Sequence, residues 1–131
     1  GFFSLALASK GFEVTGIEGS RDSHSCAVAA AKLNEIQGIK FKRGRVESEI
    51  ARTGKADLVV SDPPRSGMTR KVIDNIAGKN PEDVVLFSCA PPTLARDLSR
   101  LCRKGYNVQD IYLIDMFPAT AHTETVVLLA R

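Results

Sequence analysis

Residues 83–105 read DVVLFSCAPPTLARDLSRLCRKG, and this stretch decides the fold class. Residues 83–88 are an apolar, β-rich run typical of a buried strand, and the alanine and two prolines after the cysteine cannot extend it. Three leucines then recur at helical spacing, which predicts a helix over 92–104 that ends at a glycine (Leu94, Leu98, Leu101 and Gly105). A buried strand that leads directly into a helix is the repeating unit of α/β folds.

The same alternation of strand and helix patterns runs along the rest of the chain. Strands are expected over residues 12–18, 39–42, 56–61, 83–88, 108–114 and 124–129, and helices over 20–37, 46–52, 69–77 and 92–104. Strands that alternate with helices predict a mostly parallel sheet that is covered on both faces. The last two strands follow each other without a helix, so we expect the final strand to pair antiparallel.

Length and composition indicate one globular domain over residues 1–131, with 44% hydrophobic and 25% charged residues. The three cysteines lack the spacing of a metal site or a disulfide framework, and there are only two histidines. We therefore expect no metal and a reducing, cytoplasmic location. The apolar runs are shorter than a membrane span. Because the chain starts in mid-pattern without Met, we expect it to be a fragment of a longer protein.

The formal net charge of +3 permits an anionic partner but does not identify one. Basic residues occur in two loose groups (Lys40, Lys42, Arg43 and Arg45; Arg96, Arg100, Arg103 and Lys104). A nucleic-acid-binding domain is expected to concentrate its basic residues on one face. We interpret most of these groups as solvated surface.

Three chemically useful residues follow predicted parallel strands directly or end them: Glu18, Asp62 and Cys89. Right-handed crossovers bring the carboxyl ends of parallel strands to one edge of the sheet, where ligands bind in such folds. An acid in the position of Glu18 commonly binds the ribose of a nucleotide-like cofactor. The alternative for Glu18 is a solvated acid before a turn.

Asp62-Pro63-Pro64-Arg65 leaves its strand rigidly, because two consecutive prolines fix φ and remove backbone donors. Such a segment holds an acid and an arginine at the sheet edge, and Arg65 is suited to a carbonyl or a phosphate. The alternative is a rigid turn without a binding role.

Cys89 is the most informative single residue. A lone cysteine after an apolar run is usually a small core residue. A place between a strand and a helix N-terminus instead favours a thiolate, through the helix dipole and free amides. Glu124 begins the last apolar run and is either a solvated strand end or a general base beside the thiol. His122 either assists that base or stabilises the loop, and the loop role is favoured.

Together these motifs resemble the RNA uridine-5-methyltransferases that act on transfer or ribosomal RNA. The resemblance rests on the segments GFFSLALA (1–8), GIE (16–18), DPPRSG (62–67), SCAP (88–91), TLARDL (93–98), DMFP (115–118) and HTETV (122–126). It implies the catalytic domain of a class I S-adenosylmethionine-dependent methyltransferase with a Rossmann-like sheet that lacks its first strand.

By position, the resemblance implies that Cys89 adds to C6 of uracil and that Glu124 removes the C5 proton after methylation. Gly1, Phe2, Glu18 and Asp62 would bind the cofactor, S-adenosyl-L-methionine. Asp62 and Arg65 would contact the base, which must leave its stack in the RNA. The implied partner is tRNA or 23S rRNA, with no metal and no membrane.

Three positions depart from the pattern usual in that family. Phe2 replaces a small polar residue, Ala90 replaces asparagine, and Arg45 replaces aspartate. These departures motivate one alternative, a non-catalytic or inactive fragment. The second alternative is a nitrogen-methylating nucleic-acid methyltransferase of the same fold. Arg65 argues against it, because those enzymes usually carry an aromatic residue after Asp-Pro-Pro and need no cysteine.

Overall fold

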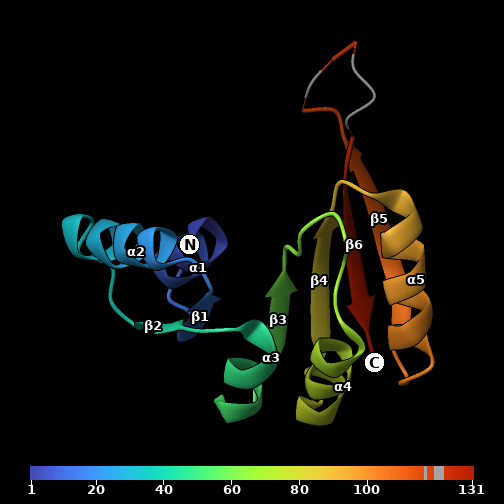
Figure 1. Cartoon of the computed structure of the whole chain (residues 1–131), viewed down its shortest axis with the longest axis horizontal. Coiled ribbons are helices and arrows are strands. Elements are labelled where there is room, and N and C mark those ends of the chain that lie inside the picture. Colours follow the sequence, from blue (N-terminus) through green and yellow to red (C-terminus); the bar gives the residue numbers. More distant parts are fainter. Residues whose placement is uncertain (117, 120–122) are drawn as a thin grey trace. The chain divides into compact units, whose positions relative to one another are not determined.

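The computed structural model describes residues 1–116, 118–119 and 123–131 (Figure 1). Its elements are α1 (Phe2–Ser9), β1 (Val14–Glu18), α2 (Arg21–Leu33), β2 (Ile39–Arg43), α3 (Val46–Glu49), the 3-10 helix η1 (Ile50–Arg52), β3 (Leu58–Ser61), α4 (Arg70–Lys79), β4 (Asp83–Ser88), α5 (Pro91–Cys102), β5 (Asn107–Ile114) and β6 (Glu124–Ala130). The expected strands and helices are present, with some ends shifted by a few residues. The chain divides into two compact units, which we call unit 1 (residues 1–53) and unit 2 (residues 54–131). A single domain over 1–131 stays a prediction.

Unit 1 is a parallel pair of strands with helices beside it. β1 pairs with β2 from Val14–Ile39 to Glu18–Arg43, and the buried hydrophobic residues of its first two helices are alanines (Ala8, Ala27 and Ala31). The Ser20 hydroxyl caps α2 by accepting the Ser23 N–H at 3.3 Å. The helix ends at Leu33, short of the expected residue 37, because Glu35 adopts the left-handed conformation with φ of 54°.

Unit 2 holds a four-stranded sheet in the order β3-β4-β6-β5. β3 and β4 are parallel, whereas β6 runs antiparallel to both of its neighbours, β4 and β5. The expected antiparallel last strand is therefore confirmed. In Figure 1 the arrow of β6 points opposite to those of β3 and β4.

The core of unit 2 lies on one face of this sheet. Burial alternates along β4 and β6, and the alternate residues on one face are almost fully buried (Val84, Leu86, Val127 and Leu129). An ion pair joins Asp74 on α4 to Lys104 just after α5, at 2.7 Å. The alternate residues on the other face of β4 and β6 are mostly half-buried, and cover on both faces stays a prediction. In the described part of the chain, no helix is long and apolar enough to cross a membrane.

Candidate active site at the strand ends of unit 2

Asp62 and Cys89 follow neighbouring parallel strands. In the β3–β4 register Ser61 pairs with Leu86, so β3 ends two residues before β4 does. Neighbouring strands lie about 4.8 Å apart. The structure thus brings Asp62 and Cys89 to the same sheet edge, with Asp62 exposed and Cys89 half-buried.

Cys89 and Glu124 come from adjacent strand ends. The last pair of the antiparallel β4–β6 ladder joins Ser88 to Thr125. Cys89 directly follows the last residue of β4, and Glu124 is the first residue of β6 and directly precedes Thr125. Glu124 is half-buried and pairs with Ile114 of β5. The register thus brings a thiol and a carboxylate that are 35 residues apart in sequence to the same end of the β4–β6 pair. His122 lies outside the described residues.

The turn that carries Cys89 is held by local hydrogen bonds. The Ala90 N–H donates to the Ser88 hydroxyl at 3.1 Å, and that hydroxyl lies 3.3 Å from the Ala90 carbonyl. The expected supply of free amides beside Cys89 is wrong in part, because α5 begins with Pro91 and Pro92. Prolines have no N–H, so only Thr93 among the first three residues of this helix carries one.

The loop after β3, residues 62–69, is attached to α5. The Met68 N–H donates to Oδ2 of Asp97 at 2.7 Å. Nη2 of Arg96 donates to the carbonyls of Ser66 and Met68, at 2.9 and 3.3 Å. Arg65 itself is exposed, and its carbonyl accepts from the Thr93 hydroxyl at 3.0 Å. The loop that carries Asp62 and Arg65 is thereby fixed to the helix that begins two residues after Cys89.

Sequence reasoning did not assign a role to Arg96 or Asp97. The leucine spacing predicts a stripe of Leu94, Leu98 and Leu101, but Asp97 is buried in the structure and Leu98 is only half-buried. The available signal is that Asp97 sits three residues after Leu94 and four before Leu101, on the apolar face of the helix. An acid in that position needs a partner, and the partner comes from a distant loop.

The remaining predicted residues, Gly1, Phe2 and Glu18, belong to unit 1. Gly1 caps α1 and packs so closely on α2 that a Cβ there would lie 2.6 Å from Ala27 Cβ. The Phe2 side chain is 76% exposed. Glu18 ends β1, and its Oε1 accepts the Ser20 N–H at 2.8 Å. A carboxylate has further acceptor sites, so this bond leaves Glu18 able to bind hydroxyl groups.

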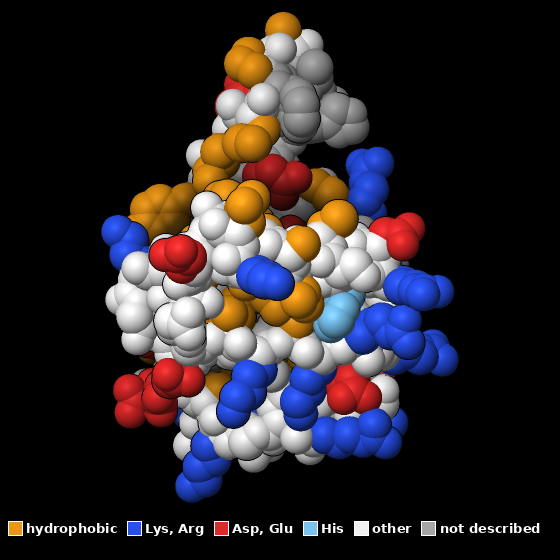
Figure 2. All heavy atoms as spheres, turned by 90° about the vertical axis from the view of Figure 1, so that its left-hand side faces the viewer, with side chains coloured by type: hydrophobic (Ala, Val, Ile, Leu, Met, Phe, Trp, Pro, Cys, Tyr) orange, Lys and Arg blue, Asp and Glu red, His pale blue; other side chains and the backbone are white. Residues whose placement is uncertain are grey.

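Arg45, which replaces the aspartate usual at this position, follows a glycine that is hydrogen-bonded to Glu18. The Gly44 N–H donates to the Glu18 carbonyl at 3.0 Å, and Arg45 is the N-cap residue of α3. The ends of β1 and β2 thus bring an acid and the Gly44-Arg45 segment together. Lys and Arg side chains occur at several places on the face drawn in Figure 2, with Asp and Glu among them.

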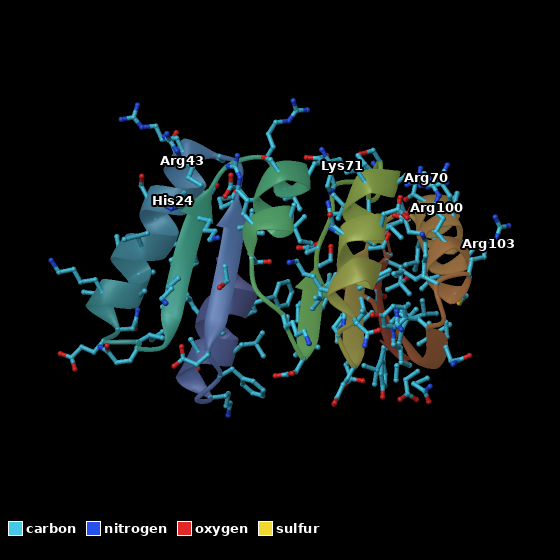
Figure 3. All side chains as sticks on the ribbon, turned by 90° about the horizontal axis from the view of Figure 1, so that it is seen from below. His24, Arg43, Arg70, Lys71, Arg100 and Arg103 are labelled. Atoms are coloured by element: carbon cyan, nitrogen blue, oxygen red, sulfur yellow. The ribbon has the colours of Figure 1, made fainter. Side chains whose placement is uncertain are left out.

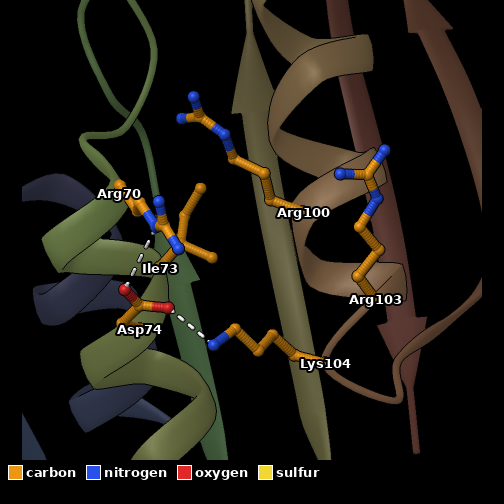
Figure 4. A pocket seen from close by; sticks show the side chains of 6 residues that line it. All are labelled: Arg70, Ile73, Asp74, Arg100, Arg103 and Lys104. Atoms are coloured by element: carbon orange, nitrogen blue, oxygen red, sulfur yellow. Dashed lines mark ion pairs between the residues drawn. The ribbon is translucent and has the colours of Figure 1, made fainter.

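A basic cavity lies between α4 and α5. It has a volume of about 320 Å³ and is lined by Arg70, Ile73, Asp74, Arg100, Arg103 and Lys104 (Figure 4). The hydrogen bond from Lys104 lowers the pKa of the Asp74 carboxyl, and the nearby Arg70 and Arg100 lower it further. Arg100, Arg103 and Lys104, which the sequence analysis interpreted as solvated surface, therefore line a cavity. In the described segments, no group of three or more His, Cys, Asp or Glu side chains is placed to hold a metal ion.

Comparison with known proteins identifies the family of this chain. Residues 51–131 match the family model of tRNA (Uracil-5-)-methyltransferase. The chain is 40% identical over 131 residues to the 23S rRNA (uracil(747)-C(5))-methyltransferase of Pyrococcus abyssi, covering 100% of this chain and 31% of that protein. It is 42% identical over 135 residues to an uncharacterised RNA methyltransferase of Protochlamydia amoebophila, with the same coverage of 100% and 31%. The chain thus spans about a third of the length of these relatives.

Two solved structures similar to this chain are also methyltransferases. The crystal structure of Pyrococcus abyssi tRNA (uracil-54, C5)-methyltransferase in complex with S-adenosyl-L-homocysteine superposes with a TM-score of 0.87 at 30% identity, covering 98% of this chain and 31% of that one. A precorrin-6y C5,15-methyltransferase from Geobacter metallireducens, with a TM-score of 0.73 at 12% identity over 91% of this chain and 67% of its own, shares the fold alone. The fold is that of the class I methyltransferases, and the chain belongs to the tRNA (uracil-5-)-methyltransferase family.

Proposed function

We propose that this chain is the catalytic part of an enzyme that methylates C5 of a uridine in tRNA or rRNA through a covalent cysteine adduct. The observation that carries the proposal is the β4–β6 register, which pairs Ser88 with Thr125 and so brings the adjoining Cys89 and Glu124 to one end of the two strands. Uracil C5 becomes nucleophilic only after a nucleophile has added to C6, and its proton must leave afterwards. A thiol and a carboxylate at the same strand ends supply these two functions.

In the proposed reaction, the Cys89 thiolate adds to C6 and leaves C5 electron-rich. S-adenosyl-L-methionine supplies the methyl group for C5 and leaves as S-adenosyl-L-homocysteine. The Glu124 carboxylate then takes the C5 proton, and the electrons of that C–H bond restore the 5,6 double bond. The C6–S bond breaks at the same time and returns the Cys89 thiolate, so the residue is regenerated.

The proposal assigns the other residues to binding. Gly1, Phe2, Glu18 and Asp62 keep the cofactor-binding roles that the resemblance implies, with the carboxylate of Glu18 accepting from ribose hydroxyls. The free acceptor sites of Glu18 support this, since one oxygen is already engaged by Ser20. Asp62 and Arg65 would contact the extruded base. The names of the relatives support an RNA substrate, and the cytoplasmic location stays a prediction.

The decisive experiment traps the adduct. The complete natural protein, numbered as this chain, is incubated with S-adenosyl-L-methionine and RNA that contains 5-fluorouridine. Fluorine at C5 cannot leave as a proton, so we expect a protein–RNA adduct that survives denaturation. Cys89→Ala should abolish it, whereas Cys102→Ala, which removes an exposed thiol of α5, should retain it.

Three results would contradict the proposal. An adduct that persists in Cys89→Ala would assign the nucleophile to another residue. Absence of any adduct while the protein methylates a base nitrogen would favour the nitrogen-methylating alternative. Absence of both adduct and methylation, with an intact fold, would favour a non-catalytic module.

A further inference from the structure

The loop of residues 62–69 contains few hydrogen bonds of its own. Pro63 and Pro64 have no N–H, and the turn is closed by one backbone bond from Gly67 to the Pro64 carbonyl at 2.7 Å. Gly67 has φ of 72°, a conformation that favours glycine. The conformation of this loop therefore depends on what it packs against.

The loop of residues 62–69 packs against three side chains on α5, which we call the α5 latch: Thr93, Arg96 and Asp97. Asp97 is 2% exposed, and its two oxygens serve different partners. Oδ2 accepts the Met68 N–H at 2.7 Å, while Oδ1 accepts Nε of Arg96 at 2.9 Å. The charge of Asp97 is thus balanced by Arg96, and Arg96 in turn binds the loop carbonyls of Ser66 and Met68.

Thr93 connects the latch to the nucleophile. Its hydroxyl lies 3.0 Å from the Arg65 carbonyl and 3.0 Å from the Ala90 carbonyl. One hydroxyl therefore bridges the loop that carries Asp62 and Arg65 to the turn that carries Cys89. Gly67 fits tightly in the same contact, because a Cβ there would lie 2.5 Å from both Arg96 Nη2 and Asp97 Oδ2.

We infer that Thr93, Arg96 and Asp97 are positioning residues, which set Asp62 and Arg65 against Cys89 without touching the substrate. The inference rests on the proposed function. Misplacement of catalytic groups by about 1 Å can cost about 100-fold in rate. The hydrogen bonds of the latch join residues that are 28 to 30 positions apart in the sequence. They connect the loop that carries Asp62 and Arg65 to the turn that carries Cys89, and the proposed reaction needs these residues in a fixed arrangement.

The test uses Asp97→Asn in the complete natural protein. An Asn side chain keeps one acceptor oxygen and replaces the other with an NH₂ group, so either Met68 or Arg96 loses its acceptor. We expect hydrogen exchange of residues 62–69 to accelerate roughly 5- to 150-fold, while exchange in β4 and β6 is unchanged. The rate of adduct formation at saturating RNA and cofactor should fall about 10- to 100-fold with little change in KM.

Matched variants separate positioning from general damage. Asp110→Asn, at an exposed position on β5, should change neither loop exchange nor rate. Thr93→Val removes the hydroxyl at constant shape and should slow adduct formation, whereas Thr93→Ser keeps the hydroxyl and should restore it. The threonine pair also keeps the inference testable if Asp97→Asn does not fold.

The outcomes are distinguishable. A wild-type protein that forms no adduct overturns the proposed function. A normal wild-type adduct together with unchanged loop exchange in Asp97→Asn, or unchanged rates in both Asp97→Asn and Thr93→Val, overturns only the latch.

A second, independent observation is the basic cavity between α4 and α5. Its lining carries four cationic side chains and one carboxylate. Lys104 and Arg70 pair with Asp74 at 2.7 and 3.8 Å, and Arg100 lies 3.8 Å from Asp97. Arg70 and Arg100 lie near each other at the ends of their helices in Figure 3, whereas the side chain of Arg103 extends outward from the end of α5. Arginine forks match phosphate oxygens in pairs.

The cavity stands at the far end of α5 from Cys89. The helix has 12 residues and rises about 1.5 Å per residue, so its ends are about 18 Å apart. A phosphate bound in the cavity would therefore lie well away from a base held at Cys89.

We propose that this cavity binds a backbone phosphate of the substrate RNA, an inference that also rests on the proposed function. The test measures RNA affinity of the complete protein as a function of salt. Arg103→Gln should weaken binding and reduce the magnitude of the log–log salt slope by about 1. Asp74→Asn removes the competing carboxylate and should strengthen binding. The control Lys55→Gln changes an exposed lysine outside the cavity.

Equal slopes for Arg103→Gln and wild type, or equal losses for Arg103→Gln and Lys55→Gln, would overturn this assignment. A protein that binds no RNA in any form would instead count against the proposed function.

Discussion

Units 1 and 2 differ in how they are packed. In unit 2 the almost fully buried side chains are large, among them Ile73, Leu101 and Tyr106, and the Tyr106 hydroxyl donates to the Pro81 carbonyl at 3.0 Å. In unit 1 the buried side chains are mostly alanines, with Ile50 the larger exception. Unit 2 has four hydrogen-bonded strands, whereas unit 1 has a pair.

The difference matches the division of chemical tasks that we propose. The residues assigned to bond making and proton removal, Cys89 and Glu124, lie on the better-packed unit. Reacting groups must be held within a fraction of an ångström, which a dense core achieves. Unit 1 carries Glu18, whose proposed task is to bind hydroxyl groups.

The largest effect should come from Glu124→Gln in unit 2. Glutamine keeps the shape but cannot take the C5 proton, so turnover should fall about 10²- to 10⁴-fold. With uridine RNA the methylated adduct should accumulate, and denaturing electrophoresis would detect it. Cofactor affinity should be unchanged. Wild-type turnover in this variant would remove Glu124 from the mechanism.

Glu18→Gln should produce the opposite pattern in unit 1. Loss of a charged acceptor weakens hydrogen bonds by about 1.5–3 kcal/mol, so the Kd for S-adenosyl-L-methionine should rise about 10- to 100-fold. Adduct formation at saturating cofactor should be nearly normal. Calorimetry and single-turnover rates together would check this. A loss of rate without a loss of affinity would break the division between the units.

Two glycines, one in each unit, differ in the space around them. A Cβ at Gly16 in unit 1 would lie 2.8 Å from the Phe41 ring, whereas one at Gly78 on α4 meets nothing within 4 Å. Gly16→Ala should destabilise the protein by about 1–3 kcal/mol through overpacking. Gly78→Ala should stabilise it by about 0.5–1 kcal/mol through helix propensity. Thermal unfolding of both variants measures the contrast, and equal shifts would contradict it.

The smallest effect concerns two aspartates of unit 2, the exposed Asp74 and the buried Asp97. Lys104 lowers the pKa of Asp74 below its ordinary value of 3.8. A lowered folded-state pKa means that the ion pair contributes above that ordinary value and is lost as pH falls through the lowered one. Lys104→Met should therefore raise the pKa of Asp74, which carboxyl NMR titration detects. Stability at pH 7 should change little, in contrast to Asp97→Asn.

The secondary structure could be predicted because local periodicity decides it. Residues 83–88 form β4 as expected, and the helix after Cys89 begins and ends within two residues of its prediction. The end of α2 was misplaced, because the left-handed conformation of Glu35 stops the helix before Gly38. No strong sequence signal marks a glutamate for that conformation.

The sequence by itself determined that Asp62 and Cys89 meet at one sheet edge, since parallel strands joined by right-handed crossovers leave no other arrangement. Only the tertiary structure decided two further relations. Cys89 and Glu124 come to the same end of two strands because the antiparallel register aligns Ser88 with Thr125, and a register depends on which strands pair. Asp97 is buried because a loop about 30 residues upstream brings the Met68 N–H to it. Long-range hydrogen bonds of this kind leave no periodic trace in the chain.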